Sequence, residues 1–256
     1  MMRNLIFVVA LILAGCGSKH SQDLEISQET KSEISQDNKQ NNKISEKPAE
    51  ISPKNDDFDP LYGYNVAMTY VNDGFYTYIY TPLVWGYDAI MPDPIQVAFK
   101  DFFHNAMYPI RLVNNLLQGK WAGAWDETKR FAINTTLGFG GLADSASLHY
   151  DLPKHDEDFG QTLASWGVGE GFPVVLPLLG QSNLRDMVGL GVDSLANPIS
   201  YVGSQWHHPS VINGARHYNE FSLGWRDYHR LREQNPHLYE TLKSVYSQKR
   251  AKEIAE

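Results

Sequence analysis

The sequence predicts a mainly helical domain carried behind a long polar segment. From residue 58 onward, apolar residues recur at helical spacing, with breaks at proline and glycine. Residues 17 to 57 are dominated by Ser, Gln, Asn, Lys and Glu and contain almost no aromatic residues. The first fifteen residues have a positive start and a short apolar core. We therefore expect a signal peptide over 1–15, a flexible polar tether over 16–57, and a helical domain over 58–256.

The N-terminal segment has the features of a secretory signal. Arg3 precedes an apolar run from Leu5 to Leu13, which is too short to span a bilayer. The run ends in Leu-Ala-Gly-Cys, which resembles the bacterial lipobox; this resemblance implies cleavage before Cys16 and lipid modification of that residue. Gly17, in place of an acidic residue, is compatible with sorting to the outer membrane. The alternative is an ordinary signal peptide followed by a chance cysteine.

The polar segment is expected to act as a tether because it cannot bury enough apolar surface to offset the entropy lost on ordering. As a coil of roughly forty residues it would span about 35 Å on average. Its isoleucines recur at intervals of about eight to ten residues, which leaves a weak coiled coil as an alternative.

Composition excludes several classes of function. The chain has 256 residues and a formal charge of -8, which argues against a nucleic-acid partner. Cys16 is the single cysteine, so an internal disulfide and a two-cysteine metal site are excluded. No apolar run after the signal peptide approaches the length of a transmembrane helix.

The first helix of the domain is predicted to start at Asp59-Pro60, with Asp59 capping and Pro60 in the first turn. It should end at Thr81-Pro82. An apolar stripe at helical period is expected to face a core: Leu61, Tyr64, Met68, Val71, Phe75, Tyr78 and Ile79. A membrane-facing stripe is the alternative, because the many Tyr and Trp residues nearby suit a headgroup-level belt. Further helices are expected over 95–103, 110–118, 122–137, 188–197, 217–232 and 238–255.

The segment from Asp158 to Asp186 is the least regular part of the domain. Asp158 can cap a helix, but three glycines at alternate positions from Gly167 disfavour its continuation. The apolar run Phe172–Leu179 contains two prolines and is too proline-rich for a central strand. We expect an irregular segment that is buried in protein or placed against lipid, because unpaired backbone groups are costly in either setting. The charged residues 152–158 before it are expected to be exposed.

Sequence motifs for catalysis, nucleotide binding and metal binding are missing. Neither the nucleophile elbow G-x-S-x-G nor H-E-x-x-H occurs. The glycines at 138–141 follow a helix and lack a Lys-Ser/Thr partner, so they read as a helix terminator. His155 lies among carboxylates without the spaced second histidine of a zinc site, and His207-His208 before Pro209 predicts a turn. We expect no enzyme, no metal and no cofactor.

Several ordered blocks resemble the MlaA/VacJ family of outer-membrane lipoproteins. They are DPLxGxN (59–65), NNLLQG (114–119), RFxxN (130–134), GxGGLxD (138–144), FGQTL (159–163), GVGEG (167–171), LPLLG (176–180) and RD (185–186). The resemblance covers Asp59 to about Tyr246 and implies a mainly α, monotopic, membrane-embedded disc or ring of amphipathic helices around an amphipathic channel. One departure is Gly171-Phe172-Pro173, where the family usually has glycine-proline-aromatic, so the detailed wall geometry is open.

The resemblance also implies a function. An outer-membrane lipoprotein, anchored on the periplasmic side, would remove mislocalised phospholipid from the outer leaflet and pass it to a periplasmic lipid-binding protein, with a trimeric porin as a second partner. The expected channel or wall residues are Arg130, Asn134, Gly140, Gly141, Asp144, Phe172, Val175, Leu176, Pro177, Leu178 and Arg185. Arg130 and Arg185 would lie near the headgroup or, alternatively, pair with nearby acids such as Asp186 or Asp193. The competing functions are a porin-associated structural lipoprotein without a channel and a membrane-bound acyl hydrolase.

Overall fold

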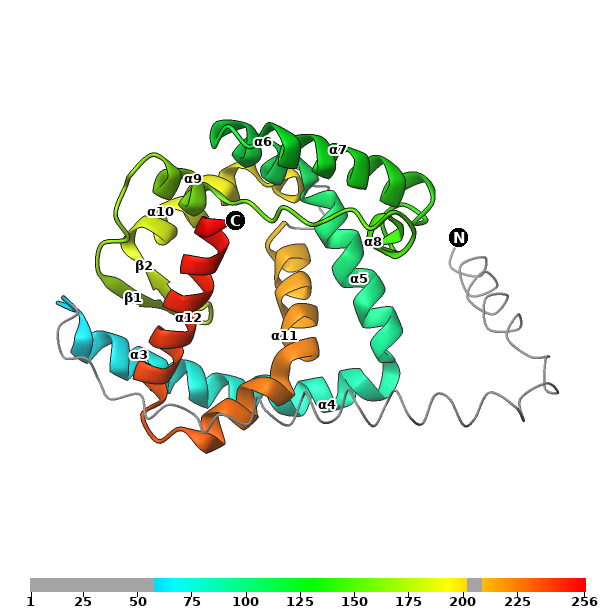
Figure 1. Ribbon diagram of the computed structural model, residues 1–256. Helices are drawn as coiled ribbons and strands as arrows, with labels where there is room; N and C mark the ends of the chain where they lie inside the picture. Colours follow the sequence, from blue (N-terminus) through cyan, green and yellow to red (C-terminus); the bar gives the residue numbers. More distant parts are fainter. Residues whose placement is uncertain (1–57, 202–208) are drawn as a thin grey trace, which may run out of the picture. The chain divides into compact units, whose positions relative to one another are not determined.

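The computed structural model describes residues 58–201 and 209–256, and within them the chain is mainly helical (Figure 1). Predictions for the signal peptide, Cys16, the tether and His207-His208 lie outside the described residues. The first half contains α3 (Tyr62–Phe75), the π-helix η1 (Tyr76–Tyr80), α4 (Thr81–Ile90), α5 (Asp93–Ala106), α6 (Tyr108–Leu117) and α7 (Trp121–Thr136). The second half contains α8 (Ser145–Tyr150), α9 (Phe159–Ser165), β1 (Pro173–Leu176), β2 (Gly180–Asn183), α10 (Leu184–Ala196), the 3-10 helix η2 (Pro198–Tyr201), α11 (Pro209–Gln234) and α12 (Leu238–Ala255).

The helices pack mainly in sequential pairs, and the last two close the arrangement. Helix α6 packs on α7, and α9 packs on α10. Helix α11 returns to α4 and α5, and α12 contacts α3, α9 and β2 (Figure 1). Segments far apart in sequence therefore meet around α12.

The predicted helix break at Thr81-Pro82 is wrong. The chain continues from α3 through η1 into α4, with Pro82 in the first turn of α4. A proline inside a helix removes one N–H and collides with the preceding turn. Here a π-turn widens the helix, and both the N–H and the hydroxyl of Thr81 donate to the carbonyl of Tyr76, the latter over 2.8 Å. The wider turn accommodates the proline.

The predicted cap at Asp59 is also wrong. Helix α3 starts at Tyr62, and its N-cap residue Leu61 makes no side-chain hydrogen bond. The carboxylate of Asp59 instead accepts hydrogen bonds from Asn65, over 3.0 Å, and from the hydroxyl of Tyr239. It joins the start of α3 to the start of α12.

Burial in α3 is the reverse of that in a water-soluble helix. Its buried residues are Asn65, Thr69, Asn72 and Asp73. Most of the stripe expected to form a core is turned outward: Val71 is 60% exposed and Tyr78 is 76% exposed. The core prediction is therefore wrong for most of the stripe, and the membrane-facing alternative stays a prediction. Among the described residues as a whole, buried polar and charged side chains outnumber buried hydrophobic ones.

The apolar run predicted to be irregular forms a β-hairpin. Strands β1 and β2 pair antiparallel, with Pro173 opposite Asn183 and Leu176 opposite Gly180. In this two-stranded sheet both strands are edges, which is where a proline is tolerated. The turn between them places Leu178 in the left-handed region, with φ of 61°.

Two asparagines of α3 pair with the outer edge of β1 as a neighbouring strand would. The amide of Asn65 donates to the carbonyl of Pro173 over 2.9 Å and accepts from the N–H of Val175 over 2.8 Å. Two helical turns later, Asn72 does the same for Leu176 and Leu178. These four backbone groups on the outer edge of β1 and in the turn are therefore satisfied by side chains of α3.

A search of the described ranges for spanning segments finds no helix with the length and apolar character needed to cross a membrane.

Candidate functional site

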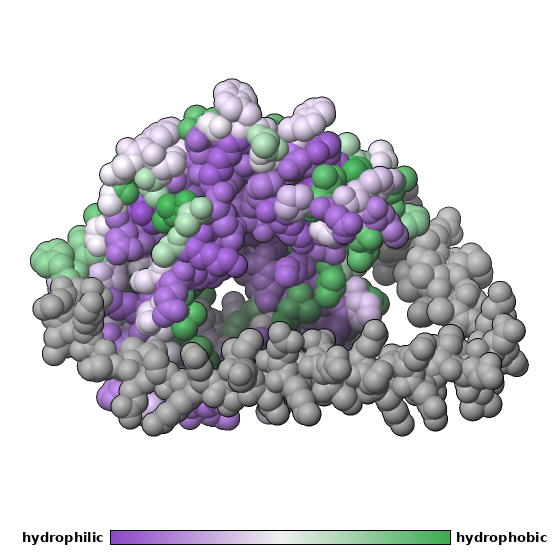
Figure 2. Space-filling view, in the orientation of Figure 1, coloured by the Kyte–Doolittle hydropathy of each residue, from purple (hydrophilic) through white to green (hydrophobic). Residues whose placement is uncertain are grey.

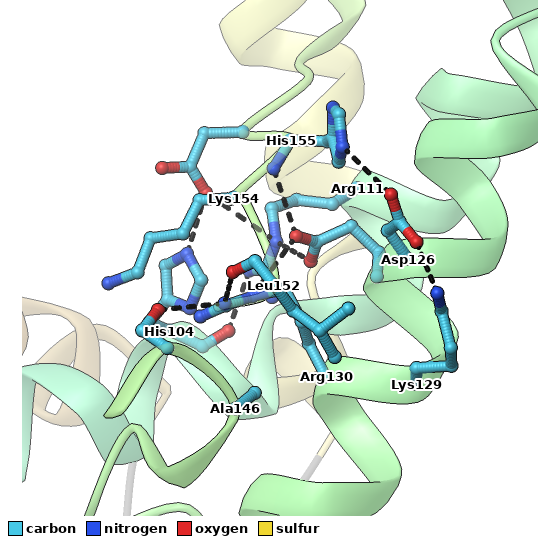
Figure 3. Close-up of polar contacts among 12 residues, drawn as sticks. His104, Arg111, Asp126, Lys129, Arg130, Ala146, Leu152, Lys154 and His155 are labelled. Carbon is cyan, nitrogen blue, oxygen red and sulfur yellow. Dashed lines mark hydrogen bonds and ion pairs between the residues drawn. The ribbon is translucent and has the colours of Figure 1, made fainter. Parts of the chain in front are cut away.

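Arg130 is the centre of a buried network at the end of α7 (Figure 3). Its guanidinium donates to Asp144 over 2.6 Å, to the hydroxyl of Ser147 over 2.9 Å and to the carbonyl of Leu152. Asn134 donates to the same carboxylate of Asp144 over 3.1 Å. Burial acts to raise the pKa of Asp144, but hydrogen bonds from Lys154 and Arg130 outweigh it and hold that pKa well below the usual range. Arg130, Asn134 and Asp144, three of the predicted channel residues, thus lie together in one network, where their role is structural.

Further charges continue this network along α6 and α7. Glu127 is fully buried; Arg111 donates to it over 2.7 Å, and the backbone N–H of His155 donates to it over 3.0 Å (Figure 3). The segment 152–158, predicted to be exposed, crosses the network, and Glu157 is buried against Lys120 at 2.7 Å. That prediction is wrong for Glu157, whereas Pro153, Lys154 and Asp156 are exposed as expected.

The glycine turn 138–141 ends α7, as predicted for a helix terminator. Gly140 and Gly141 have positive φ values of 77° and 96°. A Cβ on Gly141 would lie 2.6 Å from the Cβ of Asn105, so only glycine allows the turn to approach α5 this closely. Gly140 has no such contact.

A second buried arginine, Arg250 of α12, joins three helices. It donates to both carboxylate oxygens of Asp158 over 2.8 and 3.0 Å and to both oxygens of Asp186 over 3.0 Å. Asp158 caps α9, and Asp186 lies in the first turn of α10. The hydroxyl of Tyr246 donates to Asp186 over 2.7 Å, and Arg185 donates to it over 3.0 Å. Of the two acids expected for Arg185, the partner is therefore Asp186.

A cavity of about 390 Å³ lies beside Arg250. Figure 2 shows the surface hollowed between α12 and α11, on a face where hydrophilic side chains predominate. Its lining combines apolar and ionic groups: Leu176, Leu179, Leu190, Asp158, Asp186, Asp193, Tyr246, Lys249, Arg250 and Glu253, with Gln181, Ser182 and His217. Such a mixture suits a ligand that is itself amphipathic.

The predicted wall residues occupy different positions around this cavity. Leu176 lines it. Val175 is buried in the hairpin at 1% exposure, Leu178 is half exposed at the turn, and Pro177 is exposed beside it. Phe172 precedes β1 and is partly buried, and the buried Arg185 packs in the Arg250 network. The hairpin thus presents one face to the cavity and keeps another inside the protein.

Sequence reasoning missed Arg250, Tyr246, Asp158 and Asp193 as members of a site. The spacing of Tyr246 and Arg250 puts both on one face of α12, which was a usable signal. Their acidic partners lie 60 to 92 residues away, and no local pattern connects them. Within the described ranges, no group of three or more His, Cys, Asp or Glu side chains is arranged to hold a metal ion.

Comparison with known proteins gives the family. A family model described as MlaA lipoprotein matches residues 57–253. The chain belongs to the MlaA lipoprotein family. This confirms the resemblance carried by the sequence blocks, including those on α3 and on the hairpin.

Two individual relatives match shorter parts of the chain than the family model does. An uncharacterized protein of Rickettsia prowazekii is 37% identical over 145 residues, which are 56% of this chain. The matched region spans 57% of the length of that relative. The intermembrane phospholipid transport system lipoprotein MlaA of Haemophilus influenzae is 30% identical over 166 residues, covering 61% of this chain and 63% of that protein.

A solved structure shares the fold. It was determined to explain the maintenance of bacterial outer membrane lipid asymmetry, and it superposes with a TM-score of 0.66 at 28% identity. The match covers 77% of this chain and 98% of the other.

Proposed function

We propose that this protein is an outer-membrane lipoprotein that removes mislocalised phospholipid from the outer leaflet and passes it to a periplasmic lipid-binding protein. The name of the Haemophilus influenzae relative, an intermembrane phospholipid transport system lipoprotein, supports this class of activity. The proposal includes anchoring through a lipidated Cys16, a domain over 58–256 that rests in the membrane, and a trimeric porin as partner.

The observation that carries the proposal is the reversed distribution of side chains. The buried residues of α3, α5, α6 and α7 are mostly polar or charged. Large apolar side chains face outward on α4 and α7: Leu83, Trp85, Ile90, Trp121 and Trp125 are all more than half exposed. In water this exposed apolar surface would favour aggregation, whereas among acyl chains it is the stable arrangement. Helices also satisfy their own backbone, so they can lie within one leaflet without crossing it.

The cavity beside Arg250 supplies a path for an amphipathic lipid. Leu176, Leu179 and Leu190 provide contacts for acyl chains, while the charged groups on α10 and α12 provide contacts for a headgroup. A headgroup stripped of water without such partners would lose several kcal/mol. Transport of this kind makes and breaks no covalent bond, so we assign no catalytic residue.

The first test is to measure phospholipid exposed on the surface of intact cells with a probe that reads only the outer leaflet. Deletion should raise the signal, the wild-type chain should restore it, and a Cys16→Ala copy should not. An unchanged signal on deletion would reject lipid removal and favour the porin-associated structural alternative.

A second test places a charge on the cavity wall. Val175 is unsuitable because it is buried, whereas Leu179 is 54% exposed and lines the cavity. Leu179→Asp should impair lipid removal, and Leu179→Met, which keeps the side chain apolar, should retain it. Normal surface lipid in cells carrying a folded, anchored Leu179→Asp protein would count against the cavity as the path.

A further inference from the structure

The cavity beside Arg250 has more negative than positive groups. Its carboxylates are Asp158, Asp186, Asp193 and Glu253, and its permanently charged cations are Lys249 and Arg250. His217, the remaining titratable base in the lining, is paired loosely with Glu220 at 3.6 Å. The four carboxylates outnumber the bases of the lining, so the cavity favours a positively charged guest over a negatively charged one.

Arg250 is not available to a ligand. Its guanidinium is committed to Asp158, Asp186 and Glu253, and its side chain is only 9% exposed. Lys249 differs, because its side chain is 73% exposed and its nearest acid, Glu253, lies 3.4 Å away. Lys249 is therefore the lining cation that can reach an incoming phosphate.

Asp193 is the carboxylate without a cation. It accepts hydrogen bonds from Asn114 over 3.1 Å and from the N–H of Phe159 over 2.9 Å. No ion pair formed within the described part of the chain includes it. Burial raises the pKa of Asp193, as expected for a partly desolvated carboxylate whose charge is not neutralised. A cationic ligand would supply the missing counter-charge.

Gln181 of β2, which also lines the cavity, has an unsatisfied hydrogen-bond acceptor. Its amide nitrogen donates to Thr69, but its amide oxygen is shielded from solvent and has no hydrogen-bond partner. A buried acceptor of this kind is costly until an N–H or O–H group reaches it. Gln181 lines the cavity, so a positively charged hydrogen-bond donor bound there would satisfy this oxygen once the amide rotates toward it.

We propose that this cavity receives the primary ammonium group of an ethanolamine phospholipid, with Asp193 as counter-charge and Gln181 as acceptor. Lys249 faces the phosphate, and Leu176, Leu179 and Leu190 contact the start of the acyl chains. A primary ammonium has three donors and no acceptor, which matches both groups. A phosphatidylglycerol headgroup offers no cation to Asp193 and adds a net negative charge. This inference rests on the proposed function, because it specifies which lipid the path prefers.

The test compares two lipids on the purified, lipidated full chain in neutral detergent. Pyrene-labelled phosphatidylethanolamine and phosphatidylglycerol, each labelled on an acyl chain, are titrated into the protein. We expect the ethanolamine lipid to bind about fivefold more tightly, the factor typical of one partly exposed ion pair. Asp193→Asn should abolish this preference and leave phosphatidylglycerol binding the same or tighter. The matched control Asp227→Asn removes an exposed acid on α11 and should keep the preference.

Further variants separate ligand contacts from structural effects. Lys249→Gln should weaken both lipids alike, because both carry the phosphate. If Asp193→Asn fails to fold, Gln181→Met decides instead, since it removes the proposed acceptor and leaves the ion pairs of the lining in place; an undiminished preference in that folded variant overturns the inference.

The outcomes also separate the two proposals. Equal binding of both lipids by the wild type overturns the headgroup preference and leaves lipid transport intact. Binding of neither lipid counts against the transport function itself. Phosphatidylcholine gives a final check, because its quaternary ammonium has no N–H for Gln181 and should bind less tightly than the ethanolamine lipid.

Discussion

The Arg130 and Arg250 networks use the same chemistry for different purposes. Each has a buried guanidinium bonded to carboxylates, and each holds the cap or first turn of another helix. The partners of Arg130 lie 14 to 22 residues away along the chain, whereas Asp186 and Asp158 lie 64 and 92 residues from Arg250. The first network closes one loop onto α7. The second brings α9, α10 and α12 together.

The second network borders the cavity whose lining combines apolar and ionic groups. A local network can be compact, because a short loop folds directly over the arginine. A network that joins three helices leaves space where their surfaces diverge, and Arg250 lies in the wall of that space. A cation conspicuous in a sequence motif, such as Arg130, can therefore be structural, while the candidate site gathers around Arg250, which bonds to two carboxylates far away in the sequence.

The largest effect should come from removing the long-range arginine. Arg250→Met would leave Asp158 without a cationic partner and Asp186 with Arg185 alone. Breaking the buried Arg250–Asp186 pair by removing one partner is strongly destabilising, so we expect a loss of about 4 kcal/mol in the free energy of unfolding. Chemical denaturation of the purified chain in detergent measures it.

Arg130→Met is the comparison for this variant. Asp144 would keep Lys154 at 3.0 Å, so the expected loss is smaller, about 3 kcal/mol. A cost for Arg130→Met that exceeds the cost for Arg250→Met would contradict the view that the long-range network is the stronger tie.

The packing of α9 on α10 offers the next test. A Cβ on Gly189 would lie 2.4 Å from the backbone nitrogen of Gly160, so the two helices meet backbone to backbone. Gly189→Ala would push them apart and pull Asp158 away from Asp186; we expect a loss of about 2 kcal/mol. Gly191→Ala, on the same helix, meets nothing within 4 Å and should be neutral or stabilising by up to about 1 kcal/mol. Equal effects in denaturation experiments would show that the close approach is not needed.

The sequence alone was sufficient to predict features that depend on neighbouring residues. Apolar periodicity and breakers located most helices, and the residues at 138–144 were recognised as a helix terminator, because these features depend on neighbours within a few positions. The same periodicity led to a wrong prediction of which face of α3 is buried. A stripe of Tyr64, Val71 and Tyr78 has the same spacing whether it faces a core or a membrane, and only the surroundings decide.

The hairpin and the cavity could not be predicted from local sequence patterns, for a related reason. Pro173 and Pro177 argue against a central strand, and the structure avoids the conflict by using side chains of α3 as the missing neighbour. Likewise, nothing near Asp193 indicates that it faces Arg250 and Lys249. Such pairings depend on the tertiary arrangement, which the sequence specifies only as a whole.

The charge on Asp186 gives the Arg250 network a pH dependence. Burial acts to raise the pKa of Asp186, but the hydrogen bonds from Arg250, Arg185 and Tyr246 lower it below its usual value. A folded-state pKa below the unfolded value, about 3.9, stabilises the protein above that pH. The contribution is lost as the pH falls from about 4 through the lowered pKa. Thermal unfolding of the wild type should therefore move to lower temperature over this acidic range.

Asp186→Asn isolates this contribution. It should lower the unfolding temperature at pH 7, and the difference from the wild type should shrink below about pH 4, where the wild-type carboxyl also becomes neutral. Asp227→Asn, at an exposed pair with Arg230, should follow the wild-type curve throughout. A constant gap between Asp186→Asn and the wild type at all pH values would show that the carboxylate charge is not the cause.

The smallest effect concerns the hairpin turn beside the cavity. Leu178 has a φ of 61°, held by hydrogen bonds from its N–H to Asn72 and from Tyr76 to its carbonyl, each 2.8 Å long. A leucine in this conformation costs about 1 kcal/mol, which asparagine largely avoids. Leu179 is similarly exposed but has no positive φ. Both Leu178→Asn and Leu179→Asn remove the same apolar side chain, so we expect the first to be more stable than the second by about 1 kcal/mol in denaturation experiments. Equal stability would mean that the turn relaxes without strain, and that the contacts from α3 do not impose its conformation.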